Sequence, residues 1–162
     1  MPLRGSGCVP GSANVRPLMI VAENIAGTEM VEAALGCWPT FHDAEVISFT
    51  AERALPFKPG FTVARLAVHV RRYETVGEGT AQYEQVLRKS VLVHFVFSGA
   101  CEFELSDFNH QNVINAISVA RVEGNEAAPL LVDIESIWGF GGSLRCSSAS
   151  IEAAEVLANA EI

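Results

Sequence analysis

The feature that most constrains the fold is a series of short segments in which apolar and polar residues alternate. The clearest covers residues 61–73, where one face carries Ala64, Leu66, Val68 and Val70 and the other carries Arg65, His69 and Arg71. Successive side chains of a β-strand point to opposite faces, so a period of two indicates a half-buried strand. This segment is therefore predicted to place one face in a core and to leave the other wet or functional.

Comparable segments recur along the chain and predict further strands, over residues 41–53, 85–97, 101–106, 130–138 and 143–151. Residues 113–122 could be helix or strand, and their β-branched content favours strand. The segment 85–97 is partly apolar on both faces, which is typical of a central strand. Short turns at 98–100 and 139–142 predict two hairpins, which pair 85–97 with 101–106 and 130–138 with 143–151. Residues 74–84 are polar and contain glycine, so we expect a loop there.

One helix is predicted ahead of these strands. Thr28 is the expected N-cap, and apolar residues fall at helical spacing up to Gly36. In the strand that follows, the adjacent apolar residues Val46 and Ile47 predict a bulge or burial on both faces. The pattern predicts an α+β fold, a mainly antiparallel β-sheet with one or two short helices, over residues 18–162 as a single domain. Residues 1–17, rich in Gly, Pro and Ser, are predicted to be a flexible extension.

Charge and hydropathy restrict the partners. The 162 residues include 11 basic and 19 acidic side chains, for a formal charge of −8. Nucleic-acid binding needs clustered Lys and Arg, so this balance argues against it and favours a basic partner. No apolar run approaches the roughly 20 residues that span a bilayer. The apolar run at residues 18–22 is also shorter than the apolar part of an export signal.

Cysteine usage indicates a cytoplasmic protein. The four cysteines are Cys8, Cys37, Cys101 and Cys146, and they form no CxxC pair and no zinc-finger spacing. Cys101 and Cys146 share strand parity with apolar neighbours, which predicts two buried thiols. A disulfide between these two stays open, because it requires their strands to be neighbours.

Residues 38–45 hold the densest chemistry of the chain, with Trp38, Phe41, His42, Asp43 and Glu45. Imidazole and carboxylate groups could hold a metal or act as acid and base. Adjacent strand residues point to opposite faces, however, so His42 and Asp43 are not expected to converge without a bulge. We favour a structural corner in which the two aromatic residues anchor in the core and the polar residues satisfy backbone donors.

Histidines supply the other candidate metal ligands. His69 and His94 would project from one sheet face if their strands pair, and His42 or His110 could complete a three-histidine zinc site. We favour contacts with neighbouring carboxylates instead.

Charged residues on the predicted strands leave two interpretations open. The same sheet face would carry Arg65, Arg71, Arg88, Glu102, Glu104, Asp133 and Glu135. These side chains could form cross-strand ion pairs, or they could form a polarised surface whose acidic part attracts a basic partner.

Two loops hold further candidates for contact. Asn109 and Asn112 could bind a ligand, but asparagine in such a polar corner more often makes a turn. Trp138, beside the glycine-rich turn 139–142, is predicted to lie in the core.

Two motifs resemble those of a known family. The first is Trp38-Pro-Thr-Phe41-His42-Asp43-Ala-Glu45-Val46, followed by a strand that ends in Arg53. The second is Asp107-Phe-Asn109-His-Gln-Asn112-Val113, which comes after the strand at 91–97. A glycine turn before a strand with Cys146 adds to the pattern. Over residues 36–157 the chain resembles immunity protein family 50 of bacterial polymorphic-toxin systems.

The resemblance implies a small cytosolic protein that binds and neutralises a toxin made by its own or sibling cells. It implies no catalysis, no cofactor and no metal, and it assigns no binding residues. The predicted signature and candidate partner contacts are Trp38, Phe41, His42, Asp43, Glu45, Asn109 and Asn112.

Three alternatives stay open beside this function. A small metal-dependent or acid–base enzyme would use His42, Asp43 and Glu45. A small-molecule-binding module would need a deep apolar pocket. A homodimer is expected if Leu92 and Val96 stay exposed on the minor sheet face.

Overall fold

The computed structural model describes residues 22–56 and 61–158, so the predicted extension at 1–17 lies outside the described residues. In chain order the elements are β1 (Ile25–Ala26), α2 (Thr28–Leu35), β2 (Ala44–Arg53), β3 (Thr62–Val76), β4 (Glu84–Ser98), β5 (Cys101–Ser106), β6 (Val113–Arg121), β7 (Leu130–Trp138), β8 (Gly141–Cys146) and β9 (Ser148–Val156). Strands dominate and one short helix accompanies them in this part of the chain, which is the α+β class predicted from the sequence.

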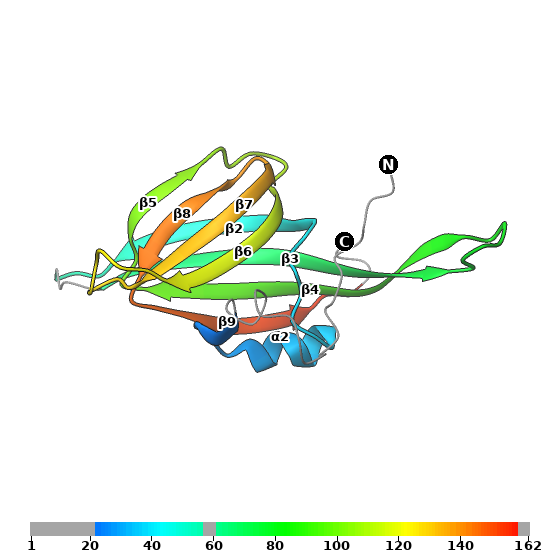
Figure 1. Ribbon diagram of the computed structural model, residues 1–162, viewed down its shortest axis with the longest axis horizontal. Helices are drawn as coiled ribbons and strands as arrows, with labels where there is room; N and C mark the ends of the chain where they lie inside the picture. Colours follow the sequence, from blue (N-terminus) through cyan, green and yellow to red (C-terminus); the bar gives the residue numbers. More distant parts are fainter. Residues whose placement is uncertain (1–21, 57–60, 159–162) are drawn as a thin grey trace.

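All nine strands of the described residues belong to one sheet, in the order β1-β9-β4-β3-β2-β6-β7-β8-β5 (Figure 1). The ladders are antiparallel except that β1 pairs with β9 in parallel, so the sheet is mixed. Between β2 and β6 the ladder consists only of Ala44 opposite Ile114 and Glu45 opposite Val113. The sheet bends back at this short ladder. We call β1, β9, β4, β3 and β2 the long half, and β6, β7, β8 and β5 the short half.

The core lies between the two halves and under α2. The four apolar residues of β3 named above are at most 1% exposed, which confirms the predicted buried face. The opposite face was predicted to be wet, but its His69 is only 8% exposed. Val91, Val93, Phe95 and Phe97 of β4 are fully buried, and β4 lies between β3 and β9 as predicted for a central strand. Each such aliphatic or aromatic side chain contributes about 1.5–3 kcal/mol when it leaves water. The predicted bulge in β2 is also present, between Val46 and Ser48.

Helix α2 and its N-cap begin one residue earlier in the chain than the sequence predicts. Gly27 is the N-cap, in the left-handed region at φ 80°, and Thr28 is already helical. A Cβ atom at position 27 would lie 2.9 Å from the carbonyl oxygen of Ile151, so the close approach of β9 selects glycine there. The Thr28 cap prediction was therefore wrong, because tertiary contact decides the cap.

The C-terminal end of α2 is tied to the sheet by two cations. Arg72 Nη1 donates to the carbonyl oxygen of Leu35 at 2.9 Å, and Lys89 Nζ donates to that of Ala34 at 3.0 Å. These carbonyls form the negative end of the helix dipole, where positive charge is stabilising. The contacts orient the helix so that Val31 and Leu35 enter the core.

The hairpin predicted between β4 and β5 is wrong. β5 pairs with β8 at the far edge of the short half, while β4 pairs with β3 and β9. The turn at 98–100 instead carries the chain from the long half to the short half. The second predicted hairpin is confirmed for β7 and β8, but its second strand ends at Cys146, and β9 returns to the long half.

These two crossing connections bond to one another. The amide and the hydroxyl of Ser147 both donate to the carbonyl oxygen of Ser98, each at 2.8 Å. Gly99 has φ 62°, and a Cβ atom there would lie 2.6 Å from Ser147 Oγ. Both the backbone conformation and the close contact therefore require glycine at this crossing.

A projecting hairpin extends the long half. Residues 74–76 and 84 belong to β3 and β4, so the predicted loop at 74–84 is shorter than expected. Figure 1 shows the two strands continuing past their neighbours to the tip. We call residues 73–87 the arm; its Tyr73 and Tyr83 are exposed.

A pair of glycine substitutions tests the crossing. Gly99→Ala should lower the free energy of unfolding by roughly 2–4 kcal/mol, because it adds backbone strain and a steric clash. Gly79→Ala is the matched control, since Gly79 has φ 77° but nothing within 4 Å of the added Cβ. Urea unfolding measures both free energies. An equal loss in the two variants would contradict a steric requirement for glycine at the crossing.

Candidate functional site

Residues 38–43 form a corner that leads into β2. The Trp38 ring packs edge-on against Phe41 with centroids 5.4 Å apart, and Phe41 packs against Phe95 at 5.6 Å. Phe41 is 1% exposed, although its backbone adopts a positive φ of 62°. The amide of Ala44 donates to the carbonyl oxygen of Phe41 and closes the corner. Both aromatic residues therefore hold the start of β2 against the core.

The polar residues of the corner do not assemble a catalytic site. His42 Nδ1 lies 3.0 Å from Asp43 Oδ1, so the expectation that these two side chains diverge was wrong. It assumed a regular strand, whereas Asp43 has φ 63° and β2 begins only at Ala44. Glu45 instead pairs with Arg71 of β3 at 3.5 Å. Among the described residues, no three His, Cys, Asp or Glu side chains are grouped to hold a metal ion.

Asn112 joins the two sequence motifs. Its carbonyl oxygen accepts a hydrogen bond from the amide of Val46, which follows the first motif. Its side-chain Oδ1 accepts from the amides of Asn109 and Phe140, and its Nδ2 donates to the carbonyl oxygen of Asn109. Asn112 is 3% exposed, so these bonds satisfy a buried amide. The residue thereby connects the start of β2, the 107–112 corner and the β7–β8 turn.

Asn109 shapes the same corner and stays exposed. Its Oδ1 accepts from the amide of Gln111, and its Nδ2 donates to the carbonyl oxygen of Asp107. These short-range bonds are those of an asparagine-made turn.

His69 and His94 project from one face of the β3–β4 pair, as predicted, but they form no common site. His69 Nε2 is 2.6 Å from Ser90 Oγ, while His94 Nε2 is 3.3 Å from a carboxylate oxygen of Glu155. Burial lowers the pKa of His69, the Arg71 charge lowers it further, and Glu45 partly opposes them. His69 is therefore held in its neutral form.

Three arginines of the long half are paired with carboxylates. The pairs are Arg65 with Glu52 and Glu152, Arg71 with Glu45, and Arg88 with Glu74. The interpretation of the charged strands as ion pairs thus holds for this half of the sheet.

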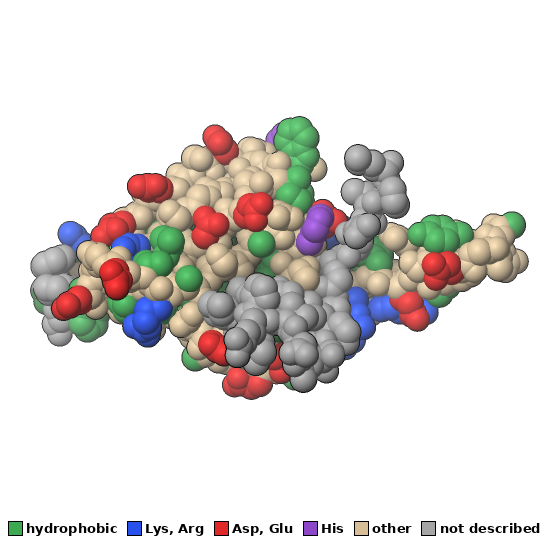
Figure 2. Space-filling model, viewed as in Figure 1, with side chains coloured by type: hydrophobic (Ala, Val, Ile, Leu, Met, Phe, Trp, Pro, Cys, Tyr) green, Lys and Arg blue, Asp and Glu red, His purple; other side chains and the backbone are tan. Residues whose placement is uncertain are grey.

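The short half differs, because three of its acidic residues lack such partners. Asp133 lies opposite Ser118 of β6 and Ser143 of β8, and Ser143 lies opposite Glu104 of β5. Within the described part of the chain, Glu104, Asp133 and Glu135 are exposed and form no ion pair, and the neighbours across the strands are small. Figure 2 shows acidic side chains spread over these strands. We call this surface the acidic face.

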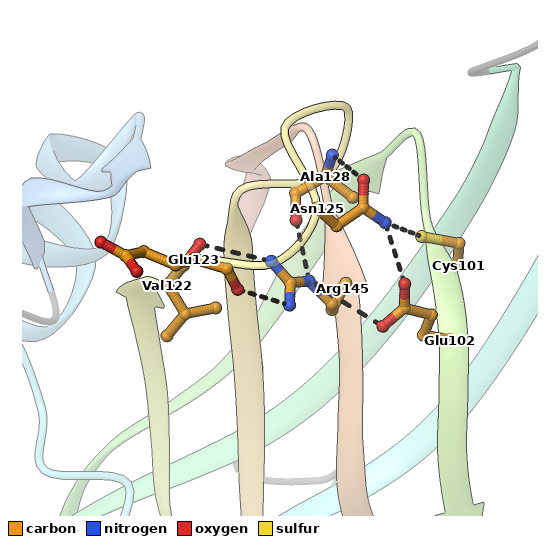
Figure 3. A network of polar contacts seen from close by, with 7 residues as sticks. All are labelled: Cys101, Glu102, Val122, Glu123, Asn125, Ala128 and Arg145. Carbon is orange, nitrogen blue, oxygen red and sulfur yellow. Dashed lines mark hydrogen bonds and ion pairs between the residues drawn. The ribbon is translucent and has the colours of Figure 1, made fainter.

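The sequence of the short half explains the excess of negative charge. Residues 101–146 contain seven Asp and Glu, two Arg and no Lys. One of those arginines, Arg145, donates to the carbonyl oxygens of Ala128, Glu123 and Val122, at 2.9, 3.1 and 3.3 Å (Figure 3). Its side chain is 13% exposed and approaches Glu102 at 4.0 Å. Arg145 therefore ties the 122–128 loop to β8 and leaves the acidic face negative.

An apolar end borders the acidic face. Ile137 and Trp138, at the end of β7, are 42% and 65% exposed. The prediction that Trp138 lies in the core was wrong, because it stands opposite Val113 at the very start of β6. Phe140, within the glycine turn, takes the core position instead and packs against Phe49 with centroids 5.5 Å apart.

The sequence placed these acids on one sheet face and left an acidic surface as one of two interpretations, but register decides which acids lack a counter-charge. Strand alternation marks Asp133, Glu135 and Ile137 as one face of β7. Only the pairing of β6, β7 and β8 places Ala116, Ser118 and Ser143 between the acids.

Residues 27–157 match the sequence model of a family described as immunity protein 50. The chain belongs to the immunity protein 50 family. The match includes both motifs and the acidic face, and it confirms the resemblance seen in the sequence. Neither the comparison with characterised proteins nor that with solved structures gave a match. Among the described helices none is long and apolar enough to span a bilayer.

In the described part of this immunity protein 50 family member, two free cysteines lie in neighbouring strands. Cys101 of β5 stands opposite Arg145 of β8, next to Cys146, and neither is in a disulfide. Burial raises the pKa of Cys146 to about 11, and burial together with Glu102 raises that of Cys101. Both thiols are protonated at neutral pH, which makes them poor nucleophiles. Cys146 is fully buried as predicted, whereas Cys101 is half-buried.

The lowered pKa of His69 predicts a pH-dependent stability. The unfolded chain binds the proton at the ordinary histidine pKa near 6.5, so it takes up more protons than the folded chain as the pH falls through that value. The free energy of unfolding should have its full value near pH 7.5 and should fall below about pH 6.5. Urea midpoints at pH 7.5 and 5.8 should differ less in His69→Gln than in the parent, whereas the exposed His110→Gln should behave like the parent. An unchanged pH dependence in His69→Gln would contradict the assignment.

Proposed function

We propose that this protein binds and neutralises a cognate bacterial toxin in the cytoplasm, without catalysis, and that the acidic face is its main docking surface. Family membership supplies the partner class, a toxin. The observation that carries the choice of surface is the row of exposed acids on the short half, which lack ion-pair partners among the described residues.

Charge determines the kind of toxin surface that fits. Carboxylates without local counter-charges gain most from a partner that carries Lys and Arg, and they steer its diffusional approach. The toxin surface should therefore be basic, and its association should slow as salt is added. Small side chains at Ala116, Ser118 and Ser143 let the backbone of a partner approach closely.

An apolar anchor adds affinity to this electrostatic surface. Ile137 continues the outer face of β7, and Trp138 follows it with most of its ring exposed. Tryptophan is enriched among the residues that carry most of the energy of protein interfaces. We place the anchor of the toxin interface here.

The motif residues contribute to this interface in two ways. Phe41 and Asn112 are buried, so their part is to hold β2, β6 and the β7–β8 turn in place. Trp38 is half-buried against the core, and Glu45 is held by Arg71. His42, Asp43 and Asn109 are accessible near the start of β6, and we propose them as contacts at the rim.

The enzyme alternative receives no support from the geometry. It requires His42, Asp43 and Glu45 to converge, and Glu45 is drawn away to Arg71. The homodimer was expected only if Leu92 and Val96 stay exposed, and both are half-buried, so this apolar patch gives it no support.

Charge reversal tests the proposal. The double variant Asp133→Lys/Glu135→Lys should bind the toxin encoded beside its gene at least about tenfold more weakly, mainly through slower association, and with a smaller dependence on salt. Surface plasmon resonance at several salt concentrations measures both effects. Glu29→Lys/Glu32→Lys on α2 is the control, since it changes the net charge equally on exposed residues outside the acidic face.

Equal losses in the two double variants would show that only net charge matters, and would remove the acidic face as the docking surface. Failure of the parent protein to bind that toxin, or to protect cells against it, would overturn the proposed function itself.

Truncation tests the anchor separately. Trp138→Ala should weaken binding of the same toxin by roughly 10–30-fold through faster dissociation, because a tryptophan anchor contributes about 2 kcal/mol at an interface. Its thermal midpoint should stay close to that of the parent, since the ring is 65% exposed. Tyr83→Ala on the arm is the control for loss of an exposed aromatic ring. An unchanged dissociation rate in Trp138→Ala would remove the anchor.

A further inference from the structure

An aromatic groove lies where β5 approaches β2. Its volume is about 380 Å³, and it is lined by Phe49, Ala51, Phe103, Leu105, Ser106, Asp107, Phe108 and Phe140. Phe49 packs against Phe103 with centroids 6.1 Å apart, and Phe108 packs against Phe140 at 5.7 Å. Phe103 and Phe108 are nevertheless 39% and 52% exposed. Four phenylalanine rings thus line an open, apolar surface.

Strand edges without a ladder partner run along both sides of this groove. β5 is the last strand of the sheet and pairs only with β8. β2 pairs with β6 only at its first two residues, so from Ser48 onward it pairs only with β3 among the described strands. The two strands meet through the Phe49 and Phe103 side chains and form no ladder. Unpaired edges are templates for an added strand.

Only part of the β5 edge is regular enough to pair with such a strand. Glu102 has φ 50°, and the register with β8 shifts between Cys101 and Glu104. A bulge and charged residues of this kind restrict indiscriminate edge pairing. The regular stretch, Glu104–Ser106, is the part that borders the groove. An added strand would therefore be short and placed beside the aromatic rings.

Charge and continuity identify the occupant. β5 belongs to both surfaces, since Glu104 lies on the acidic face while Phe103 and Leu105 line the groove. Asp107 adds a carboxylate to the groove itself. A strand beside β5 would present alternate side chains to the two surfaces. The fitting segment therefore alternates apolar with basic residues.

We propose that an extended segment of the cognate toxin adds to the free edge of β5, places an apolar side chain in the aromatic groove and turns a Lys or Arg toward Glu104 or Asp107. This rests on the proposed function and names the second element of the same interface. Backbone hydrogen bonds along β5 supply affinity, and the groove selects the side chain. A small apolar molecule could fill the groove but would leave the edge of β5 unpaired.

Overlapping synthetic peptides that cover the toxin encoded beside the gene provide the test. One peptide with alternating apolar and basic residues should bind the full-length protein, measured by fluorescence anisotropy. Hydrogen exchange should then show new protection of amides in β5. No peptide binding together with unchanged exchange in β5 within the whole toxin complex would overturn the proposal.

Variants separate the groove from the acidic face. Phe103→Ser and Phe108→Ser should each weaken binding of the peptide by about tenfold or more. Tyr83→Ser, which removes an exposed aromatic ring on the arm, should leave peptide binding unchanged. Circular dichroism and thermal midpoints check that each variant is folded, and Phe108→Ser, in a loop, serves if Phe103→Ser unfolds. Loss of whole-toxin binding in the Asp133→Lys/Glu135→Lys variant, with no effect of either Phe variant, would overturn the groove proposal and leave the proposed function standing.

Discussion

The short ladder between β2 and β6 is the constraint on which the architecture depends. A sheet with one apolar face must cover that face, and this chain does so by bending its sheet back at two residue pairs. Asn112 holds the bend, because its backbone and side-chain bonds join β2, the 107–112 corner and the β7–β8 turn. The crossing of the chain at Ser98 and Ser147 closes the other end. The core of Phe95, Phe97 and their neighbours lies between these two joints.

The bend also produces the surfaces that a partner can use. It turns the outer face of β7 and its neighbours toward solvent, where acids and small residues are left without counter-charges. It leaves the later part of β2 and all of β5 unpaired along one side, with aromatic rings between them. Ion pairs occupy Arg65, Arg71 and Arg88 of the long half, whereas Glu104, Asp133 and Glu135 of the short half have no such partners among the described residues. A binding role fits this division better than catalysis does.

Much of the fold was predictable from short-range pattern. The alternation at Ala64 to Val70 correctly identified the buried face of β3, and the bulge beside Ile47 followed from two adjacent apolar residues. The family was predictable too, because the two motifs are runs of residues with unusual chemistry. The errors concern partners in space: β5 pairs with β8, Trp138 is exposed, and His42 contacts Asp43. Left-handed backbone at Phe41 and Asp43 breaks the strand geometry that the sequence argument assumed.

The sequence by itself determined the buried apolar faces of the central strands, the one described helix, the family and the acidic balance, since each depends on neighbouring residues or on counting. Tertiary structure alone decided which strands pair, where the charges stand uncompensated and where edges stay open. The physical reason is that a period of two reports which side of a strand is buried but carries no information about the strand beside it. Pairing is settled when distant segments close one core, and here that closure sets Asp133 among small residues and Phe103 beside Phe49.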